Sequence, residues 1–286
     1  MKDIGLSVII PVYNEEESIK NTLKDLKNVM KDSKIKYEIL VVDDGSTDNT
    51  AKMVKGDGIN LIKHPQNMGY GAALKTGIRN AKGGLILITD ADGTYPAKDI
   101  PKLIEYADKY DMVIGARTGK NVKIPLHRRP AKWLLSKLAN FLSGTRIPDL
   151  NSGIRVFRKK DIENFFRIIP SGFSFTTTIT LAYLVNNYSV GFVPIDYLKR
   201  EGKSKIRPIR DSVNFFSLII KTITYFNPLK IFIPISILIF IAALFIFLYS
   251  FFITGRLMDV TIIVLVVASI QIALFGLFAD LIVKRG

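Results

Sequence analysis

The sequence contains no cysteine and only two histidines among its 286 residues. The lack of cysteine excludes a disulfide framework and a cysteine-based zinc site. The two histidines, His64 and His127, stand far apart in the sequence, and we interpret both as structural. Acidic residues are also scarce, 25 against 40 lysines and arginines, so the net charge is +15. This imbalance favours anionic partners such as nucleotide phosphates or an anionic membrane surface.

Long apolar runs are missing from residues 1–228 but dominate the rest of the chain. Residues 229–252 and 260–283 are each 24 residues long and nearly free of charge, whereas a membrane-spanning helix needs roughly 20 residues. Their short connection predicts a transmembrane hairpin over residues 229–286, in which Gln271 is expected to bridge the two helices. A homo-oligomer is compatible with such a small hairpin.

Basic residues lie mainly on one side of the hairpin, and no apolar signal segment precedes the first expected strand. The positive-inside rule then predicts a multi-pass protein of the cell membrane, with two spans and with both termini and the first domain in the cytoplasm. Because the chain carries membrane segments, we do not expect nucleic acid as its anionic partner.

Short apolar segments alternate with helical patterns in the first half of the chain. Strands are expected at residues 7–12, 38–42, 59–63, 85–89, 112–115, 149–157 and 190–194, and helices at residues 15–31, 48–55 and 69–81. This alternation predicts an α/β domain at residues 1–206, with helices on both faces of the sheet. Residues 207–228 have apolar side chains near helical spacing, which favours an amphipathic helix in the membrane interface. The alternative is an amphipathic helix packed on the first domain.

Asp90 and Asp92 directly follow an apolar strand. Two carboxylates at the end of a buried strand repel each other and attract a cation. Since no histidine or cysteine is near, Mg²⁺ or Mn²⁺ is the expected ion. A plain turn or a helix cap is the alternative reading of the two aspartates.

Two more polar clusters follow neighbouring strands. Asp43 and Asp44 end the second strand, where a carboxylate can accept hydrogen bonds from a base or a ribose; capping of the next helix is the alternative. Asn67 and Gly69 precede a helix, where backbone amides can approach a phosphate; a simple loop-to-helix turn is the alternative. Ligands of parallel sheets bind beyond the carboxyl ends of the strands, so these clusters predict one nucleotide site.

The segments SVIIPVYNEE (7–16), VVDDGSTD (41–48), NMGYG (67–71) and DAD (90–92) together resemble the family 2 glycosyltransferases with the GT-A fold. The resemblance covers about residues 5–210 and implies a Rossmann-like mixed sheet and sugar transfer with inversion. It also implies a metal site at Asp90 and Asp92. The residues expected to hold the nucleotide are Pro11, Tyr13, Glu15, Asp43 or Asp44, Asn67, Gly69 and Ala91.

Four further segments resemble the polyprenyl-phosphate sugar synthases, of the dolichol-phosphate mannose synthase type: GAR (115–117), LLSKLAN (134–140), DLNSGIR (149–155) and REGKSK (200–205). This likeness assigns Arg117, Lys132 and Ser136 to the acceptor phosphate. It places Arg200, Lys203 and Lys205 near the phosphates. An arginine is usual where Lys132 stands, so Arg128 or Arg129 is the alternative. Thr94 replaces a glutamine found near the metal in the mannose synthases, so GDP-mannose is not singled out as the donor.

A phosphate acceptor also suits the chemistry of the chain. A phosphate monoester is already anionic and needs no general base, only neutralisation of crowded negative charge by basic side chains and a metal. An alcohol acceptor would need a carboxylate base, for which Asp149 is the candidate; a role in orienting an arginine or lysine is the alternative. The predicted reaction moves one sugar from a GDP- or UDP-linked donor to a polyprenyl (dolichyl) phosphate.

Two other functions remain open from the sequence. The first is transfer to another lipid or glycan, although the Q-x-x-R-W motif of processive polysaccharide synthases is missing. The second is a non-catalytic membrane protein that binds nucleotide sugars. The two carboxylates of the D-A-D segment argue against the second.

Overall fold

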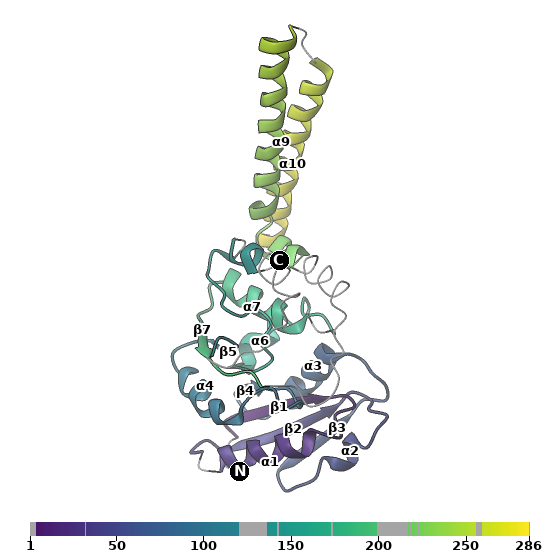
Figure 1. Cartoon of the computed structure of the whole chain (residues 1–286), viewed down its shortest axis with the longest axis vertical. Coiled ribbons are helices and arrows are strands. Elements are labelled where there is room, and N and C mark those ends of the chain that lie inside the picture. Colours follow the sequence, from purple (N-terminus) through teal and green to yellow (C-terminus); the bar gives the residue numbers. More distant parts are fainter. Residues whose placement is uncertain are drawn as a thin grey trace.

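The computed structural model describes residues 4–31, 33–119, 136–141, 143–172, 174–198, 217, 219–221, 223–255 and 259–285. A domain built on one sheet carries two long apolar helices that project from it as a hairpin (Figure 1). The N-terminal end of the chain lies at the far side of the domain from this hairpin.

Seven strands form a single mixed sheet, as predicted. They are β1 (Leu6–Val12), β2 (Tyr37–Asp43), β3 (Ile59–Lys63), β4 (Leu85–Ile88), β5 (Met112–Ala116), β6 (Arg155–Arg158) and β7 (Val190–Pro194). Their order is β3-β2-β1-β4-β6-β5-β7, and only β6 runs antiparallel to its neighbours. The strand expected at residues 149–157 is wrong over 149–154. There Asn151 N–H donates to Asp149 Oδ1 at 3.4 Å and Ser152 Oγ donates to Gly115 O at 2.5 Å, which bends the chain before β6 begins.

Helices cover both faces of the sheet because side chains of each strand alternate between two apolar clusters. In β1, Val8 and Ile10 face one cluster and Ile9 faces the other. The first cluster is covered by α1 (Ile19–Met30) and α4 (Ile100–Tyr106), and the second by α3 (Tyr70–Asn80) and α7 (Phe175–Val185). The shorter helices are α2 (Thr50–Met53), η1 (Ala97–Asp99) and α6 (Lys159–Glu163).

A third apolar cluster joins the domain to the hairpin. Ile219 and Ile223, from the helical segment before the hairpin, are fully buried in it against Leu181 of α7. Ile231, in the first turn of the hairpin, packs on the same cluster. This part of the predicted amphipathic helix therefore lies against protein, which is the alternative that the sequence left open; residues 199–216 lie outside the described residues.

The hairpin consists of α9 (Leu229–Tyr249), a π-helical turn η3 (Ser250–Thr254) and α10 (Asp259–Arg285). Both helices are long and apolar enough to cross a membrane. Small residues line their contact, where Ser236 Oγ donates to Ser269 O at 2.8 Å. The expectation for Gln271 is wrong, because its side chain is exposed on the outer face of α10. Close packing at small residues takes the place of the expected polar bridge.

Replacing Gly276 with leucine is expected to force α9 and α10 apart. A Cβ atom at this position would already lie 2.6 Å from Phe232 Cβ, and overpacking costs about 1–3 kcal/mol. The unfolding midpoint in detergent is therefore expected to fall by several degrees. Leu277→Val, on the exposed side of α10, should leave the midpoint unchanged. Equal midpoints for both variants would contradict this packing.

Candidate functional site

The carboxyl ends of β1, β2 and β4 meet at one edge of the sheet, because these strands are adjacent and parallel. The loops that follow them begin near Tyr13, Asp44 and Asp90, so the polar segments singled out in the sequence come together. Pro11 is buried in β1, and Tyr13 and Glu15 are half-buried just beyond it. Ala91 is buried, and its carbonyl accepts a hydrogen bond from Thr22 Oγ1 at 3.0 Å.

Hydrogen bonds join the loop after β1 to the loop after β2. Asn14 has a φ of +52°; its N–H donates to Ser46 Oγ at 3.0 Å and its Oδ1 accepts from Thr47 N–H at 2.8 Å. Glu15 N–H donates to Thr50 Oγ1 at 2.8 Å. These bonds join the two loops into one continuous wall of the site, beside the end of the sheet.

The two aspartates at the end of β2 have different surroundings. Asp44 accepts from Met68 N–H at 2.9 Å and from Gly69 N–H at 2.8 Å, and His64 Nδ1 lies 2.7 Å from its Oδ1. Asp43 accepts from Ser46 N–H through Oδ1 at 3.0 Å, and within the described part of the chain its Oδ2 makes no hydrogen bond. Asp44 therefore anchors the loop before α3, and Asp43 is the better placed of the two to accept from a ligand.

The glycines before α3 are required by packing. Gly69 has a φ of +101°, and a Cβ there would lie 2.5 Å from Ser171 O. Ala72 N–H donates to the same carbonyl at 3.0 Å. Gly69 N–H already donates to Asp44, so this amide is occupied. The close approach of a phosphate to Gly69 and to the exposed Asn67 stays a prediction.

The aspartates after β4 are held by separate neighbours. Tyr70 Oη donates to Asp90 Oδ1 at 2.9 Å, and a Cβ at Gly153 would lie 2.4 Å from Asp90 Oδ2. Asp92 is 7% exposed, and its Oδ1 accepts from Thr94 Oγ1 at 2.6 Å. Burial and the nearby Asp90 raise the pKa of Tyr70 well above its usual range, so its hydroxyl stays protonated and keeps donating.

These two carboxylates suit a hard divalent cation, whose preferred ligands are oxygen atoms. Within the described ranges, no group of three or more histidine, cysteine, aspartate or glutamate side chains is placed to hold a metal ion. Mg²⁺ commonly binds through one or two carboxylates together with substrate phosphates. Asp90 and Asp92 fit that pattern and do not form a complete cage by themselves.

Arg117 and Asp149 form a close pair on the far side of β4. Arg117 Nε lies 2.6 Å from Asp149 Oδ2 and Nη2 lies 2.8 Å from Oδ1, while Asp149 is only 1% exposed. Burial opposes the charge of Arg117, but Tyr95 and the bonds to Asp149 raise its pKa overall. Both carboxylate oxygens bind Arg117, so the geometry favours the alternative in which Asp149 orients an arginine.

Most of the remaining residues predicted to bind the acceptor lie outside the part of the chain that the structure describes. Ser136 is half-buried in a helical segment, and the residues that precede it lie outside the described part of the chain. The other residues, Arg128, Arg129, Lys132, Arg200, Lys203 and Lys205, lie outside the described residues. Four residues near Asp90, namely Tyr70, Tyr95, Gly153 and Arg155, have no role predicted from the sequence. The sequence feature that could have indicated Gly153 and Arg155 is their position within the otherwise apolar run around Ile154 and Val156.

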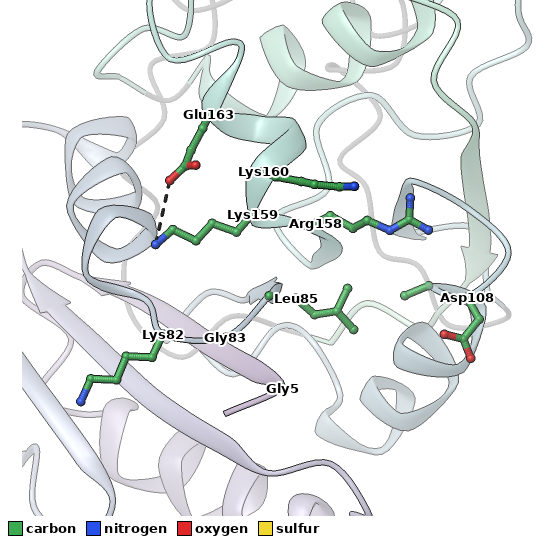
Figure 2. A pocket seen from close by; sticks show the side chains of 11 residues that line it. Gly5, Lys82, Gly83, Leu85, Asp108, Arg158, Lys159, Lys160 and Glu163 are labelled. Carbon is green, nitrogen blue, oxygen red and sulfur yellow. Dashed lines mark ion pairs between the residues drawn. The ribbon is translucent and has the colours of Figure 1, made fainter. Parts of the chain in front are cut away.

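A basic groove of about 770 Å³ lies at the opposite ends of the strands. Gly5, just before β1, and Leu85, at the start of β4, line it. Figure 2 shows Lys159 beside Glu163 in this groove, with 3.9 Å between Nζ and Oε1. Ligands of parallel sheets bind at the carboxyl ends, so the groove is separate from the candidate site. Substitutions in this groove can therefore serve as controls for substitutions in the candidate site.

Two family models together match most of the chain. The model described as glycosyl transferase family 2 matches residues 7–166, and the model described as GtrB C-terminal hairpin matches residues 227–284. The first match lies within the sheet domain and ends before α7 and β7, and the second covers the hairpin. The domain boundaries at 206 and 228 stay predictions.

Similar proteins include named sugar transferases. The chain is 29% identical over 218 residues to a dolichyl-phosphate hexose transferase of Haloferax volcanii, covering 76% of this chain and 92% of that protein. It is 29% identical over 231 residues to an undecaprenyl-phosphate 4-deoxy-4-formamido-L-arabinose transferase of Pseudomonas fluorescens, covering 75% of this chain and 64% of the relative.

The solved structure of glucosyl-3-phosphoglycerate synthase from Mycobacterium tuberculosis, with Mn²⁺, UDP-glucose and phosphoglyceric acid, has a similar fold. The TM-score is 0.60 at 17% identity, covering 77% of this chain and 79% of that one. At this level of identity the likeness shows the fold alone.

Proposed function

Since the chain belongs to glycosyl transferase family 2 and is a glycosyltransferase, we propose that it transfers one sugar, with inversion, from a nucleotide sugar to a polyprenyl phosphate. The observation that carries this proposal is the position of Asp90 and Asp92. They lie at the carboxyl end of β4, beside the loops of β1 and β2, in a domain joined to two helices of membrane-spanning length. The relatives named for transfer to dolichyl and undecaprenyl phosphate support the class of acceptor.

The donor nucleotide would lie against the wall formed by the loops after β1 and β2. Asp43 Oδ2 would accept a hydrogen bond from the base or the ribose, beside Pro11, Tyr13 and Glu15. Asn67, Gly69 and Ala91 would border the same nucleotide. Asp44 has a supporting role, because His64 and two backbone amides already bind its carboxylate.

Asp90 and Asp92 would hold Mg²⁺ or Mn²⁺ together with oxygens of the donor diphosphate. When bound, such an ion takes up negative charge on the departing nucleoside diphosphate. Tyr70 would keep the Asp90 carboxylate oriented through its hydrogen bond to Oδ1. Thr94 would do the same for Asp92.

The acceptor phosphate would approach the anomeric carbon from the face opposite the diphosphate. A phosphate oxygen forms the new bond to this carbon, and the bond from the carbon to the donor oxygen breaks, leaving its electron pair on the nucleoside diphosphate. No proton needs to be removed, because the acceptor is already anionic. Arg117, Ser136, Lys132 or Arg129 would bind the acceptor, and Arg200, Lys203 and Lys205 would neutralise the phosphates.

The hairpin would keep this reaction at the membrane. We propose residues 1–206 as the catalytic domain, 207–228 as a connecting helical region and 229–286 as a two-span anchor, with the domain and both termini in the cytoplasm. Holding the site at the bilayer raises the effective concentration of a lipid acceptor. Ile231 packs on the cluster that contains Leu181, which supports a fixed distance between site and membrane.

A donor screen tests the proposed reaction. Full-length protein in detergent would be mixed with a polyprenyl phosphate, Mg²⁺ or Mn²⁺, and GDP-mannose, UDP-glucose or UDP-N-acetylglucosamine. We expect a lipid-linked sugar from one donor, only when a metal ion is added. If nucleotide sugar binds but no donor yields product, the binding-protein alternative replaces this proposal.

Replacing Arg117 with lysine is expected to raise the KM for polyprenyl phosphate about ten-fold and to leave the KM for the nucleotide sugar unchanged. Lysine keeps the charge but loses the two-pronged contact with Asp149, so the charge is no longer fixed in place. Initial rates at varied acceptor concentration measure this effect. Arg158→Lys, in the partly exposed pair with Asp111, is the matched control. An acceptor KM that is the same in both variants would remove Arg117 from the acceptor site.

A further inference from the structure

Arg155 is a buried charge with no acidic partner among the residues that the structure describes. It lies in β6, paired with Ile88 of β4 and Ile114 of β5, and its side chain is 0% exposed. Its guanidinium donates to Ser152 O at 2.5 Å, Thr176 O at 3.0 Å and Thr180 Oγ1 at 2.9 Å. Its Nε has no hydrogen-bond partner within the described part of the chain. Burial lowers its pKa to about 10, so the group is charged at neutral pH. A buried charge without a counter-ion lowers the stability of the folded protein. We therefore infer that Arg155 contributes more than packing.

Arg155 is connected to Asp90 through the turn before β6. The carbonyl of Ser152 belongs to the turn before β6, and the next residue in this turn is Gly153. Gly153 N–H donates to Tyr95 Oη at 2.7 Å, and a Cβ at Gly153 would lie 2.4 Å from Asp90 Oδ2. The Asp90 carboxylate is thus confined between the backbone of Gly153 and the hydroxyl of Tyr70.

We propose that Arg155 is a positioning residue for the carboxylate of Asp90. By tying the turn before β6 to α7, it holds Gly153 against Asp90 and fixes the orientation in which this carboxylate meets the metal ion. The inference rests on the proposed function, because it takes Asp90 as a metal ligand. Groups that orient a metal ligand commonly change metal affinity by about 10–100-fold when they are replaced.

A purely electrostatic role makes a different prediction. A positive charge near a metal site repels the ion, so removal of that charge alone would strengthen metal binding. Arg155→Lys keeps the charge and loses the planar arrangement of donors. A purely electrostatic role therefore predicts unchanged Mn²⁺ binding by this variant, whereas a positioning role predicts weaker binding.

The experiment measures Mn²⁺ binding to the full chain in detergent, with UDP or GDP present, from the electron paramagnetic resonance signal of free Mn²⁺. Arg155→Lys is expected to bind Mn²⁺ about ten-fold more weakly. Arg158→Lys, three residues along the same strand and at its outer end, is expected to bind like the unaltered protein. The same samples are checked for folding by circular dichroism.

A gentler pair of variants covers the case in which Arg155→Lys does not fold. Thr180→Val removes an acceptor of Arg155, whereas Thr178→Val removes a hydroxyl of the same buried helix that donates only to Ser174 O, at 3.0 Å. Thr180→Val should lower the unfolding midpoint more than Thr178→Val, because the Thr180 hydroxyl also donates to Thr176 O at 2.8 Å. Only Thr180→Val is expected to weaken Mn²⁺ binding, by about three- to ten-fold.

Two outcomes overturn the inference, and they are distinguishable. Normal Mn²⁺ affinity in folded Thr180→Val, or in folded Arg155→Lys, would overturn the role of Arg155 and leave the proposed function intact. If the unaltered protein binds no Mn²⁺ with either nucleotide, the proposed metal site is wrong and the inference falls with it.

Discussion

Asp92→Asn is expected to lower the rate of sugar transfer by at least about 100-fold without changing the fold. Asparagine has nearly the same shape and can still accept from the Thr94 hydroxyl, which now binds Asp92 Oδ1 at 2.6 Å. The substitution removes the negative charge, which is the feature that a divalent cation requires. The loss should therefore appear in catalysis and in metal binding, while the unfolding midpoint changes little.

Asp108→Asn is the matched control for this prediction. Asp108 is an exposed aspartate that lines the basic groove at the opposite ends of the strands. Both variants would be assayed with the same donor, lipid phosphate and Mn²⁺ concentration. A transfer rate for Asp92→Asn close to that of Asp108→Asn would exclude Asp92 from the metal site.

Gly153→Ala is expected to reduce transfer by more than about ten-fold through displacement of Asp90. The new methyl group would lie 2.4 Å from Asp90 Oδ2 and 2.9 Å from its Cγ, so the carboxylate or the turn must move. Overpacking of this kind typically costs about 1–3 kcal/mol. Because the carboxylate is the group that yields, we expect the loss mainly as a higher Mn²⁺ requirement.

The control for Gly153→Ala is Gly84→Ala, since a Cβ at Gly84 meets nothing within 4 Å. Titration of the transfer rate with Mn²⁺ would compare the two variants. A curve for Gly153→Ala that overlies the curve for Gly84→Ala would show that Asp90 does not depend on this contact.

The sequence predicts the sheet and the position of the site because both depend on local patterns. The strand over Ile59–Lys63 is found as expected, and so is the one over Val190–Pro194. Apolar runs that end in Asp43 and Asp90 place these side chains at one edge, since β1 pairs in parallel with both β2 and β4. The hairpin follows from hydropathy and length alone.

The supporting contacts could not be predicted because they depend on packing between distant segments. Asp44 and Asp43 are neighbours in the sequence, and only the approach of His64 and the loop at Gly69 distinguishes their environments. The strand expected at residues 149–157 starts later, because the side chains of Asp149 and Ser152 bind backbone groups nearby. Likewise Gln271 is exposed, since small residues such as Gly276 let the helices meet directly.

A comparison of acceptors shows whether the protein transfers sugar to a lipid phosphate. Full-length protein in lipid nanodiscs would receive the active nucleotide sugar, Mn²⁺, and either polyprenyl phosphate, the corresponding polyprenol or a diacylglycerol, and products would be identified by mass spectrometry. We predict a product that carries one sugar from polyprenyl phosphate and none from the two alcohols, because the described site pairs Asp149 with Arg117 and provides no free carboxylate base there. Efficient transfer to polyprenol or diacylglycerol, with none to the phosphate, would show that the acceptor is an alcohol.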